Sequence, residues 1–283
     1  MGHVQVLTVS CKDRPGITAR VTGHLFEHGG NVLEAQQFND ALSGAFFLRI
    51  EFDMPGDGAT LRASFTPLAA EFGMSWALRD KERAHKVLIL VSKFDHCLAD
   101  LLYRQRIGEL PMEVAAVISN HQREALSISL PDDIPFHYLP VDPAEKLRQE
   151  ARIKAIVEDT GAELIVLARY MQILSDDLAA FLSGRCINIH HSFLPGFKGA
   201  RPYHQAHARG VKMIGATAHY VTADLDEGPI IHQAVEPVTH ADSPEEMVRK
   251  GRDIERRVLA EAVRLHLQDR VLLNGDRTVV FRT

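Results

Sequence analysis

Apolar and polar residues alternate in several short runs along residues 1–80, as they do in strands that are buried on one face. Four runs are predicted as strands: residues 3–10, 31–39, 45–53 and 74–79. The first of two helices is predicted after Pro15, with an apolar stripe that starts at Ile17. The second is predicted at roughly 58–72, where Pro67 favours a kink or an early stop. The order βαββαβ predicts a ferredoxin-like domain.

From residue 87 onward the pattern changes to continuous apolar runs separated by amphipathic segments. The predicted strands are residues 87–91, 114–119, 135–141, 164–168 and 186–190, and the predicted helices lie near 97–107, 143–160 and 175–183. Strands that are apolar on both faces and alternate with helices predict a doubly wound α/β fold with a mostly parallel sheet. The charged segment 81–86 is expected to link this second domain to the first.

The C-terminal part of the chain is predicted as a long helix followed by a hairpin. Residues 243–246 (Ser-Pro-Glu-Glu) form a capping box with proline at the first helical position. Residues 271–281 are expected to turn at Asn274-Gly275. We therefore expect residues 87–283 to fold as one domain.

Composition and charge narrow the classes of function. A chain of 283 residues that is 46% hydrophobic can form two packed domains, and its net charge of −5 gives no basic surplus for nucleic acid. No apolar run reaches the roughly 18 residues that a membrane span needs, and the start does not resemble a secretory signal. Cys11, Cys97 and Cys186 lie far apart, which indicates a reduced protein of the cytoplasm.

Residues 188–228 contain the residue types that acyl transfer needs. Asn188 and His190 lie one residue apart on a predicted strand, so both side chains point to the same face. Asp226 follows in an acidic loop. An amide can donate to a developing oxyanion, an imidazole can move a proton near neutral pH, and a carboxylate can act as a base. The glycine-rich segment 194–199, which includes Lys198-Gly199, is typical of a loop beside a ligand site.

Each of these features also has a simpler structural interpretation. An Asn-x-His pair on a strand is commonly a satisfied polar pair, and an acidic segment that ends in glycine is commonly a turn. A metal hydrolase is a further alternative, because His204 and His207 follow His190-His191 in the sequence. Adjacent histidines on a strand point to opposite faces, however, and no HExxH motif or cysteine pair supports them, so no metal is expected. The first strand of this domain ends in Ser92-Lys93-Phe94-Asp95 without glycine, so no nicotinamide cofactor is expected either.

The same segment resembles the folate-dependent formyltransferase family. The shared motifs are N-I-H-x-S-x-L-P at residues 188–195, G-x-T-x-H-x-V at 215–221 and D-x-D-x-G at 224–228. The similarity covers nearly all of residues 86–240 and implies that Asn188, His190 and Asp226 are catalytic. It also implies a folate pocket with these substrate-binding residues: Arg169, Met171, Gln172, Ile173, Leu174, His191, Ser192, Thr217, His219, Ala223, Asp224, Leu225, Glu227 and Gly228.

The N-terminal domain resembles an ACT domain. The similarity lies in residues 13–17 (Asp-Arg-Pro-Gly-Ile) and in Gly29-Gly30-Asn31. ACT domains commonly bind amino acids between paired subunits, so the resemblance implies a homo-oligomer, either a dimer or a tetramer. The implied regulatory amino-acid site consists of Asp13, Arg14, Pro15, Gly16 and Asn31. An ACT domain that serves assembly alone is the open alternative.

An ACT domain followed by a formyltransferase-like domain resembles formyltetrahydrofolate deformylases. The resemblance implies hydrolysis of 10-formyltetrahydrofolate to formate and tetrahydrofolate, with water as the formyl acceptor. Such a reaction supplies formate and balances the one-carbon units used in purine synthesis. Folate is then the substrate and no cofactor is expected.

Two other functions are alternatives to hydrolysis: formyl transfer to an amine such as glycinamide ribonucleotide, and a non-enzymatic amino-acid sensor. Hydrolysis is favoured because no glycine-rich phosphate loop follows the strand 87–91. Arg169 stands where that transferase has a small residue beside the acceptor, and His191 replaces the family's usual proline, as in deformylases. The intact catalytic triplet argues against a sensor. Gln172 stands where the family often has arginine.

Overall fold

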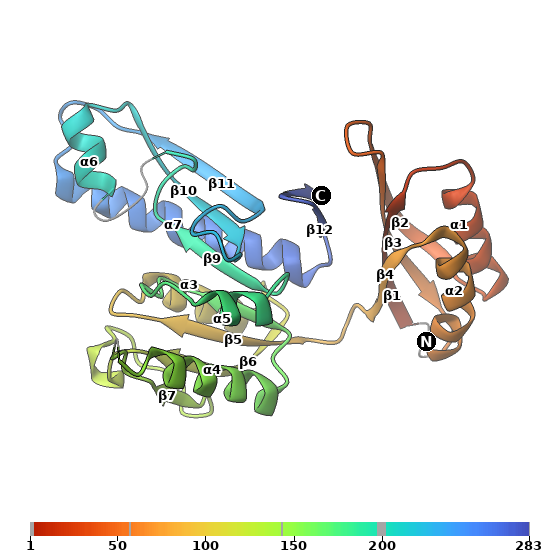
Figure 1. Cartoon of the computed structure of the whole chain (residues 1–283), viewed down its shortest axis with the longest axis horizontal. Helices are drawn as coiled ribbons and strands as arrows, with labels where there is room; N and C mark the ends of the chain where they lie inside the picture. Colours follow the sequence, from red (N-terminus) through yellow and green to blue (C-terminus); the bar gives the residue numbers. More distant parts are fainter. Residues whose placement is uncertain (1–2, 57, 143, 197–201, 283) are drawn as a thin grey trace. The chain divides into compact units, whose positions relative to one another are not determined.

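The computed structural model describes residues 3–56, 58–142, 144–196 and 202–282. The chain forms two compact units (Figure 1). The first unit consists of residues 1–84 together with 268–283, and the second consists of residues 85–267. Lys198 and Gly199 of the expected loop lie outside the described residues.

The first unit has the predicted βαββαβ order. Its elements are β1 (His3–Lys12), α1 (Ile17–Glu27), β2 (Asn31–Asp40), β3 (Ala45–Met54), α2 (Ala59–Phe72) and β4 (Ser75–Asp80). The strands form an antiparallel sheet in the order β2-β3-β1-β4, with the helices packed on one face around Leu7 and Phe52. The expected early stop at Pro67 does not occur. Because Phe65 and Leu68 are buried beside the exposed proline, packing holds α2 together through it.

The C-terminal hairpin belongs to the first unit, although the sequence analysis placed it in the second domain. Its strands are β12 (Val271–Asn274) and β13 (Arg277–Val280), paired around the predicted Asn274-Gly275 turn. Leu272 and Phe281 pack against Phe47. Phe47 alternates with core residues of β3, so it lies on the sheet face opposite α1 and α2. The alternating apolar residues of this segment predict a hairpin, but they do not predict which sheet the hairpin covers. The second unit therefore ends at Leu267, and not at residue 283 as expected.

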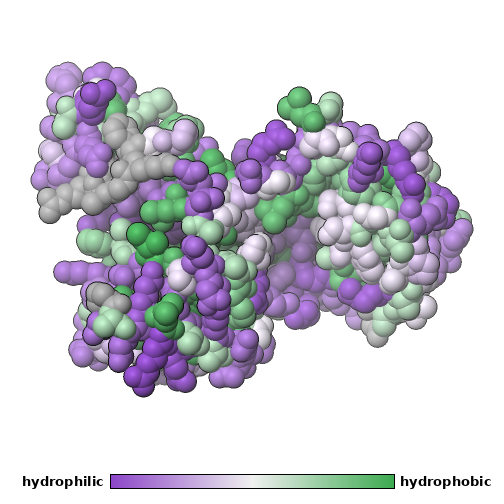
Figure 2. All heavy atoms as spheres, in the orientation of Figure 1, coloured by the Kyte–Doolittle hydropathy of each residue, from purple (hydrophilic) through white to green (hydrophobic). Residues whose placement is uncertain are grey.

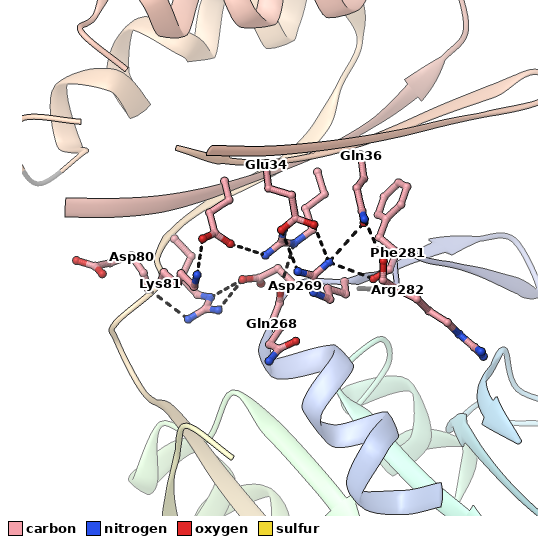
Figure 3. A network of polar contacts seen from close by, with 12 residues as sticks. Glu34, Gln36, Asp80, Lys81, Gln268, Asp269, Phe281 and Arg282 are labelled. Atoms are coloured by element: carbon pink, nitrogen blue, oxygen red, sulfur yellow. Dashed lines mark hydrogen bonds and ion pairs between the residues drawn. The ribbon is translucent and has the colours of Figure 1, made fainter. Parts of the chain in front are cut away.

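Ion pairs reinforce this packing between the sheet and the C-terminal segment (Figure 3). Arg270 pairs with Glu34 of β2, with 2.9 Å between Nη2 and Oε2. Arg49 of β3 pairs with the same carboxylate at 3.1 Å, and Arg79 pairs with Asp269 at 2.6 Å. Arg49 and Arg270 are 2% and 5% exposed, so the two guanidinium groups lie in the interior of the first unit.

The second unit is an α/β structure around a seven-stranded sheet (Figure 1). Its elements are β5 (His85–Val91), α3 (His96–Arg106), β6 (Met112–Ser119), the 3-10 turn η1 (Arg123–Ala125), β7 (Phe136–Tyr138), α4 (Lys146–Thr160), β8 (Leu164–Leu167), α5 (Asp176–Phe181), β9 (Cys186–His190), α6 (Pro202–Arg209), β10 (Met213–Tyr220), β11 (Ile230–Pro237) and α7 (Pro244–Leu267). The strand order is β11-β10-β9-β8-β5-β6-β7. Strands β5 to β9 run parallel, whereas β10 and β11 are antiparallel to their neighbours. The mostly parallel sheet confirms the predicted fold class.

The core of the second unit follows from its apolar strands. Residues 87–91 of β5 are all fully buried, as expected for a strand covered on both faces. α4 and α5 contribute Ile153 and Leu178 to a cluster with Leu88 and Leu90. α7 packs on β9, β10 and β11. It begins with the predicted capping box, in which the backbone N–H groups of Ser243 and Glu246 bond each other's side chains. Strand β11 was not expected from the sequence.

The surface is mainly hydrophilic in the face shown by Figure 2, and hydrophobic residues there lie in small groups. Among the described helices, none is both long and apolar enough to span a membrane.

Candidate active site

The topology of the sheet creates a crevice beside β5 and β8. The chain runs from β5 outward to β6 and β7 and then returns to β8 on the other side, so the direction of winding reverses here. In such sheets ligands bind beyond the carboxyl ends of the strands at the reversal. Ser92, directly after β5, fixes the segment that follows β8. Its backbone N–H donates to the carbonyl of Arg169 at 3.3 Å, and its hydroxyl accepts from the N–H of Met171 at 3.0 Å.

A cavity of about 290 Å³ lies in this crevice. It is lined by Leu167, Arg169, Tyr170, Met171, Gln172, Ile173, Leu174, Asn188, Ile189, His190, His191, His219, Val221, Thr222, Ala223, Asp224, Leu225 and Asp226. The structure therefore brings the three predicted catalytic residues together with the segments 171–174 and 223–226. Five further lining residues were not predicted from the sequence: Leu167, Tyr170, Ile189, Val221 and Thr222. For the first three, a place at the end of a strand was the only available signal.

His190 and Asp226 lie side by side in the lining of the cavity. Nδ1 of His190 lies 3.1 Å from Oδ2 of Asp226. Burial raises the pKa of Asp226, but its hydrogen bond with His190 and the nearby imidazole of His219 outweigh burial and hold that pKa well below its usual value. The carboxylate is thus ionised at neutral pH and accepts the Nδ1–H of His190. Nε2 of His190 is buried and has no hydrogen-bond partner among the described residues, so it is available to a ligand.

A second histidine orients Asn188. Nδ1 of His219 lies 2.9 Å from the carbonyl oxygen of Tyr220, which fixes the ring as the Nδ1–H tautomer when it is neutral. Nε2 then accepts a hydrogen bond from the Asn188 amide at 3.3 Å. β9 and β10 place Asn188 directly opposite His219 in their register. The Asn188 side chain therefore presents a fixed amide to the cavity.

His191 and Arg169 both line the cavity. The rings of His190 and His191 stack with 5.1 Å between their centroids. Burial lowers the pKa of His191 to about 4, and the charge of Arg169 acts in the same direction. His191 is therefore neutral at pH 7. Arg169 has a positive φ of 65° and is 11% exposed.

Four predicted substrate-binding residues lie outside the lining of this cavity: Ser192, Thr217, Glu227 and Gly228. The hydroxyl of Thr217 is fully buried and bonds the backbone of Ser192 and Leu194, so it ties β10 to the loop after β9. Gly228 permits two backbone segments to lie close together. A Cβ there would lie 1.8 Å from the carbonyl oxygen of Tyr220. These two residues hold the loops of the site in place.

A group of potential metal ligands lies together behind the cavity, among the residues that the structure describes: His96, Cys97 and Glu255. Burial raises the pKa of Cys97 far above its usual value, so the thiol keeps its proton. Glu255 already bonds Tyr203 and pairs with Arg169. The group fits an internal ion-pair network better than a metal site. Glu255 was not predicted from the sequence, although an acidic residue on the apolar stripe of the last helix was a usable signal.

Comparison with known proteins relates both units to established families. Residues 85–263 match the formyl transferase model, and residues 5–63 match the ACT domain model. The chain is 51% identical over 282 residues to the formyltetrahydrofolate deformylase of Corynebacterium sp. (strain P-1), with 98% of each protein covered. The crystal structure of a formyltetrahydrofolate deformylase from Burkholderia mallei has a TM-score of 0.94 and 51% identity, and covers 99% of this chain and 100% of that one.

A glycinamide ribonucleotide transformylase from Symbiobacterium toebii is less similar, with a TM-score of 0.63 and 31% identity over 70% of this chain and 95% of its own. The fold and the cavity thus define a formyl transferase domain joined to an ACT domain. The chain belongs to the formyl transferase family and, within it, to the formyltetrahydrofolate deformylases, which it matches along both units.

Proposed function

We propose that this chain hydrolyses 10-formyltetrahydrofolate to formate and tetrahydrofolate, as the names of its closely similar relatives indicate. One observation supports the chemistry most directly. The His190–Asp226 pair, at 3.1 Å, lies in one cavity with the oriented amide of Asn188. These groups supply a proton relay and an oxyanion donor for cleavage of a formamide.

Folate binding is assigned to the two loops that line the wider part of the cavity. Residues 171–174 provide apolar side chains, of which Met171 and Ile173 are more than half exposed. Residues 223–226 lie across the same cavity and offer backbone groups and carboxylates. Apolar walls with a few polar groups suit a flat heterocycle such as a pterin. Gln172 provides a neutral amide where much of the family has a guanidinium.

In the proposed reaction the formyl carbonyl lies against Asn188 and His190. A water molecule, oriented by Asp226 directly or through His190, attacks the carbonyl carbon and loses a proton to this pair. The Asn188 amide and protonated His190 stabilise the tetrahedral oxyanion. N10 then takes up a proton as the C–N bond breaks, and formate leaves.

Purified protein should release formate from 10-formyltetrahydrofolate without any added amine. Formate can be measured with a coupled formate dehydrogenase, and tetrahydrofolate by its absorbance. Formylation of an added amine with no formate in its absence would instead favour the transferase alternative. Activity that survives chelators is expected and would dismiss the metal hydrolase. A chain that releases formate under no condition would be an amino-acid sensor.

The first unit is proposed to bind an amino acid. Asp13, Arg14, Pro15 and Gly16 line one cavity together with Gln37 and Asn39 of β2. Asn31, also predicted for this site, lies at the opposite end of β2 and not in that lining. A site that includes both this cavity and Asn31 would therefore need a second chain, which the proposed homo-oligomer would supply. Calorimetry with a panel of amino acids tests the proposal, and no heat from any of them would favour a role in assembly alone.

The proposed place of action is the cytoplasm. Its support is chemical: the three cysteines are all free, and Cys97 and Cys186 are buried. Fractionation of the producing cells would test it.

A further inference from the structure

A buried ion pair behind the cavity takes no part in the steps proposed above. Glu255 of α7 is 1% exposed. Its carboxylate accepts from the hydroxyl of Tyr203 at 2.7 Å and lies 2.8 Å from Nε2 of His96. Nε of Arg169 lies 3.3 Å from the same carboxylate. Burial raises the pKa of Glu255, but these partners outweigh burial and lower it, so the carboxylate stays ionised. The buried carboxylate of Glu255 thus pairs with the Arg169 side chain.

Arg169 keeps its position against a local conformational preference. Its φ of 65° lies in the left-handed region that glycine adopts without strain. Strained residues of this kind tend to occur at functional sites. Nε and Nη1 are buried without a hydrogen-bond partner among the described residues, so bonds within the protein do not saturate the guanidinium. The residue lines the cavity beside His190 and His191.

We propose that Glu255 is a positioning residue that holds Arg169 at the cavity, and that the Arg169 guanidinium selects water over amines as the formyl acceptor. The proposal rests on the hydrolysis proposed above and adds the basis of its acceptor specificity. The positive charge of Arg169 acts inside the cavity, because it lowers the pKa of His191 more than the Glu255 carboxylate raises that pKa.

The selection of water over an amine follows from the charges that form during the two reactions. In both reactions the bond from the formyl carbon to N10 breaks and N10 gains a proton. Water forms a C–O bond, and formate leaves as an anion after its proton has passed to the His190–Asp226 pair. An amine forms a C–N bond, and its nitrogen is positive until it loses a proton. A fixed guanidinium stabilises the hydroxide-like water, the oxyanion and the formate, and disfavours the cationic nitrogen.

The test measures how the formyl group divides between two acceptors. Enzyme is incubated with 10-formyltetrahydrofolate and a fixed concentration of glycinamide at about pH 8. Formate is measured by coupled assay and N-formylglycinamide by mass spectrometry. Arg169→Ala keeps the backbone strain but removes the charge, and should lower the ratio of formate to formylglycinamide at least about tenfold, the equivalent of one pKa unit of interaction. Arg169→Lys keeps the charge and should lie between Arg169→Ala and the unmodified chain.

Glu255→Gln should shift the ratio in the same direction by a smaller factor. In an Arg169→Ala background it should have no further effect on the ratio, because Glu255 acts through Arg169. Glu150→Gln is the matched control. Glu150 of α4 is 4% exposed and accepts from the N–H of Ser175 at 2.9 Å, without an ion pair to Arg169. This control should lower stability and leave the ratio unchanged.

The proposal is overturned if the ratio of formate to formylglycinamide in Arg169→Ala lies within twofold of that in the unmodified chain. It is also overturned if Glu255→Gln changes this ratio further in the Arg169→Ala background. A merely structural role would lower both products together and leave their ratio constant. The unmodified chain serves as the separate check of the proposed function, since absence of formate from it would contradict hydrolysis itself.

Discussion

Asn188 has one orientation, because His219 accepts from its amide and is itself fixed by the carbonyl of Tyr220. A fixed donor stabilises an oxyanion without reorganising during the reaction. We therefore expect Asn188→Ala to lower kcat about 10²–10³-fold, with little change in the temperature of unfolding. Formate release under saturating substrate measures the effect. Asn274→Ala, the same change in the C-terminal hairpin, should leave kcat per folded molecule unaltered. A loss of less than tenfold in Asn188→Ala would argue against oxyanion stabilisation by this residue.

His191 predicts a pH dependence of stability. A histidine whose pKa is lower in the folded state than in the unfolded state destabilises the fold as pH falls, because the unfolded chain takes up the proton first. The pKa of His191 falls from 6.5 to about 4 on burial, so the loss begins near pH 6.5 and ends near pH 4. Between pH 7 and pH 5 it amounts to about 2 kcal/mol. His191→Gln should remove this part of the acid destabilisation.

Urea unfolding of both chains at pH 7 and pH 5 measures the difference. The free energy of unfolding should fall less in His191→Gln than in the unmodified chain. Parallel decreases would show that His191 takes up its proton equally easily in the folded and unfolded states, and would contradict the neutral ring inferred for the site.

At the scale of elements, the acidic loop between β10 and β11 depends on one close contact. A Cβ at Gly228 would lie 1.8 Å from the carbonyl oxygen of Tyr220, so any side chain there must displace the loop that carries Asp226. We expect Gly228→Ala to separate Asp226 from His190, to lower kcat at least about tenfold, and to destabilise the fold by about 1–3 kcal/mol through overpacking. Formate release and thermal unfolding test both effects.

Gly23→Ala is a suitable control for this substitution. Gly23 lies in α1 with no atom within 4 Å of an added Cβ, and its φ is ordinary. Alanine there should be neutral or stabilise the helix by up to about 1 kcal/mol. If both substitutions left kcat unchanged, the position of the acidic loop would not limit the reaction.

The sequence predicted single helices and strands better than the contacts between them. Apolar and polar residues alternate at 45–53, and residues 87–91 are all apolar. Each pattern depends only on which faces of one strand are buried, so both strands could be predicted from local sequence. Strand β11 was missed because it lies on the antiparallel edge, where half-exposed residues blur the pattern. The Asn188-x-His190 spacing placed two side chains on one face. The proximity of Asp226 came from family resemblance alone, since no local pattern brings a residue 36 positions away into contact.

Ion-pair networks were the least predictable part of the site. Glu255 stands one turn from Gly251 on the buried face of α7, so its sequence position indicated burial but not its partners. Its contacts come from α3, α6 and the segment after β8, which only the folded sheet brings together. The same holds for Glu34 and Arg270, which are 236 positions apart.

At the scale of the whole molecule, the first unit is completed by the last residues of the chain. The backbone therefore passes between the units twice, near residue 84 and near residue 268. Arg270 is the central contact of the returning segment. Besides Glu34, it reaches the carbonyl oxygen of Phe281 at 3.3 Å, so it links the sheet to both ends of the hairpin. Its removal should loosen the first unit without touching the cavity.

Arg270→Met tests this arrangement in the full chain. Breaking a fully buried pair costs about 3–5 kcal/mol, but Glu34 is about one-third exposed, so we expect a loss of about 2 kcal/mol in urea unfolding. Arg277→Met is the matched control, because the Arg277 side chain is 59% exposed where it pairs with Asp40, and should cost less than about 1 kcal/mol. Formate release per folded molecule should stay the same in both. Equal losses in the two variants would mean that apolar packing on Phe47 alone retains the hairpin, and the buried guanidinium would then contribute no net stability to the first unit.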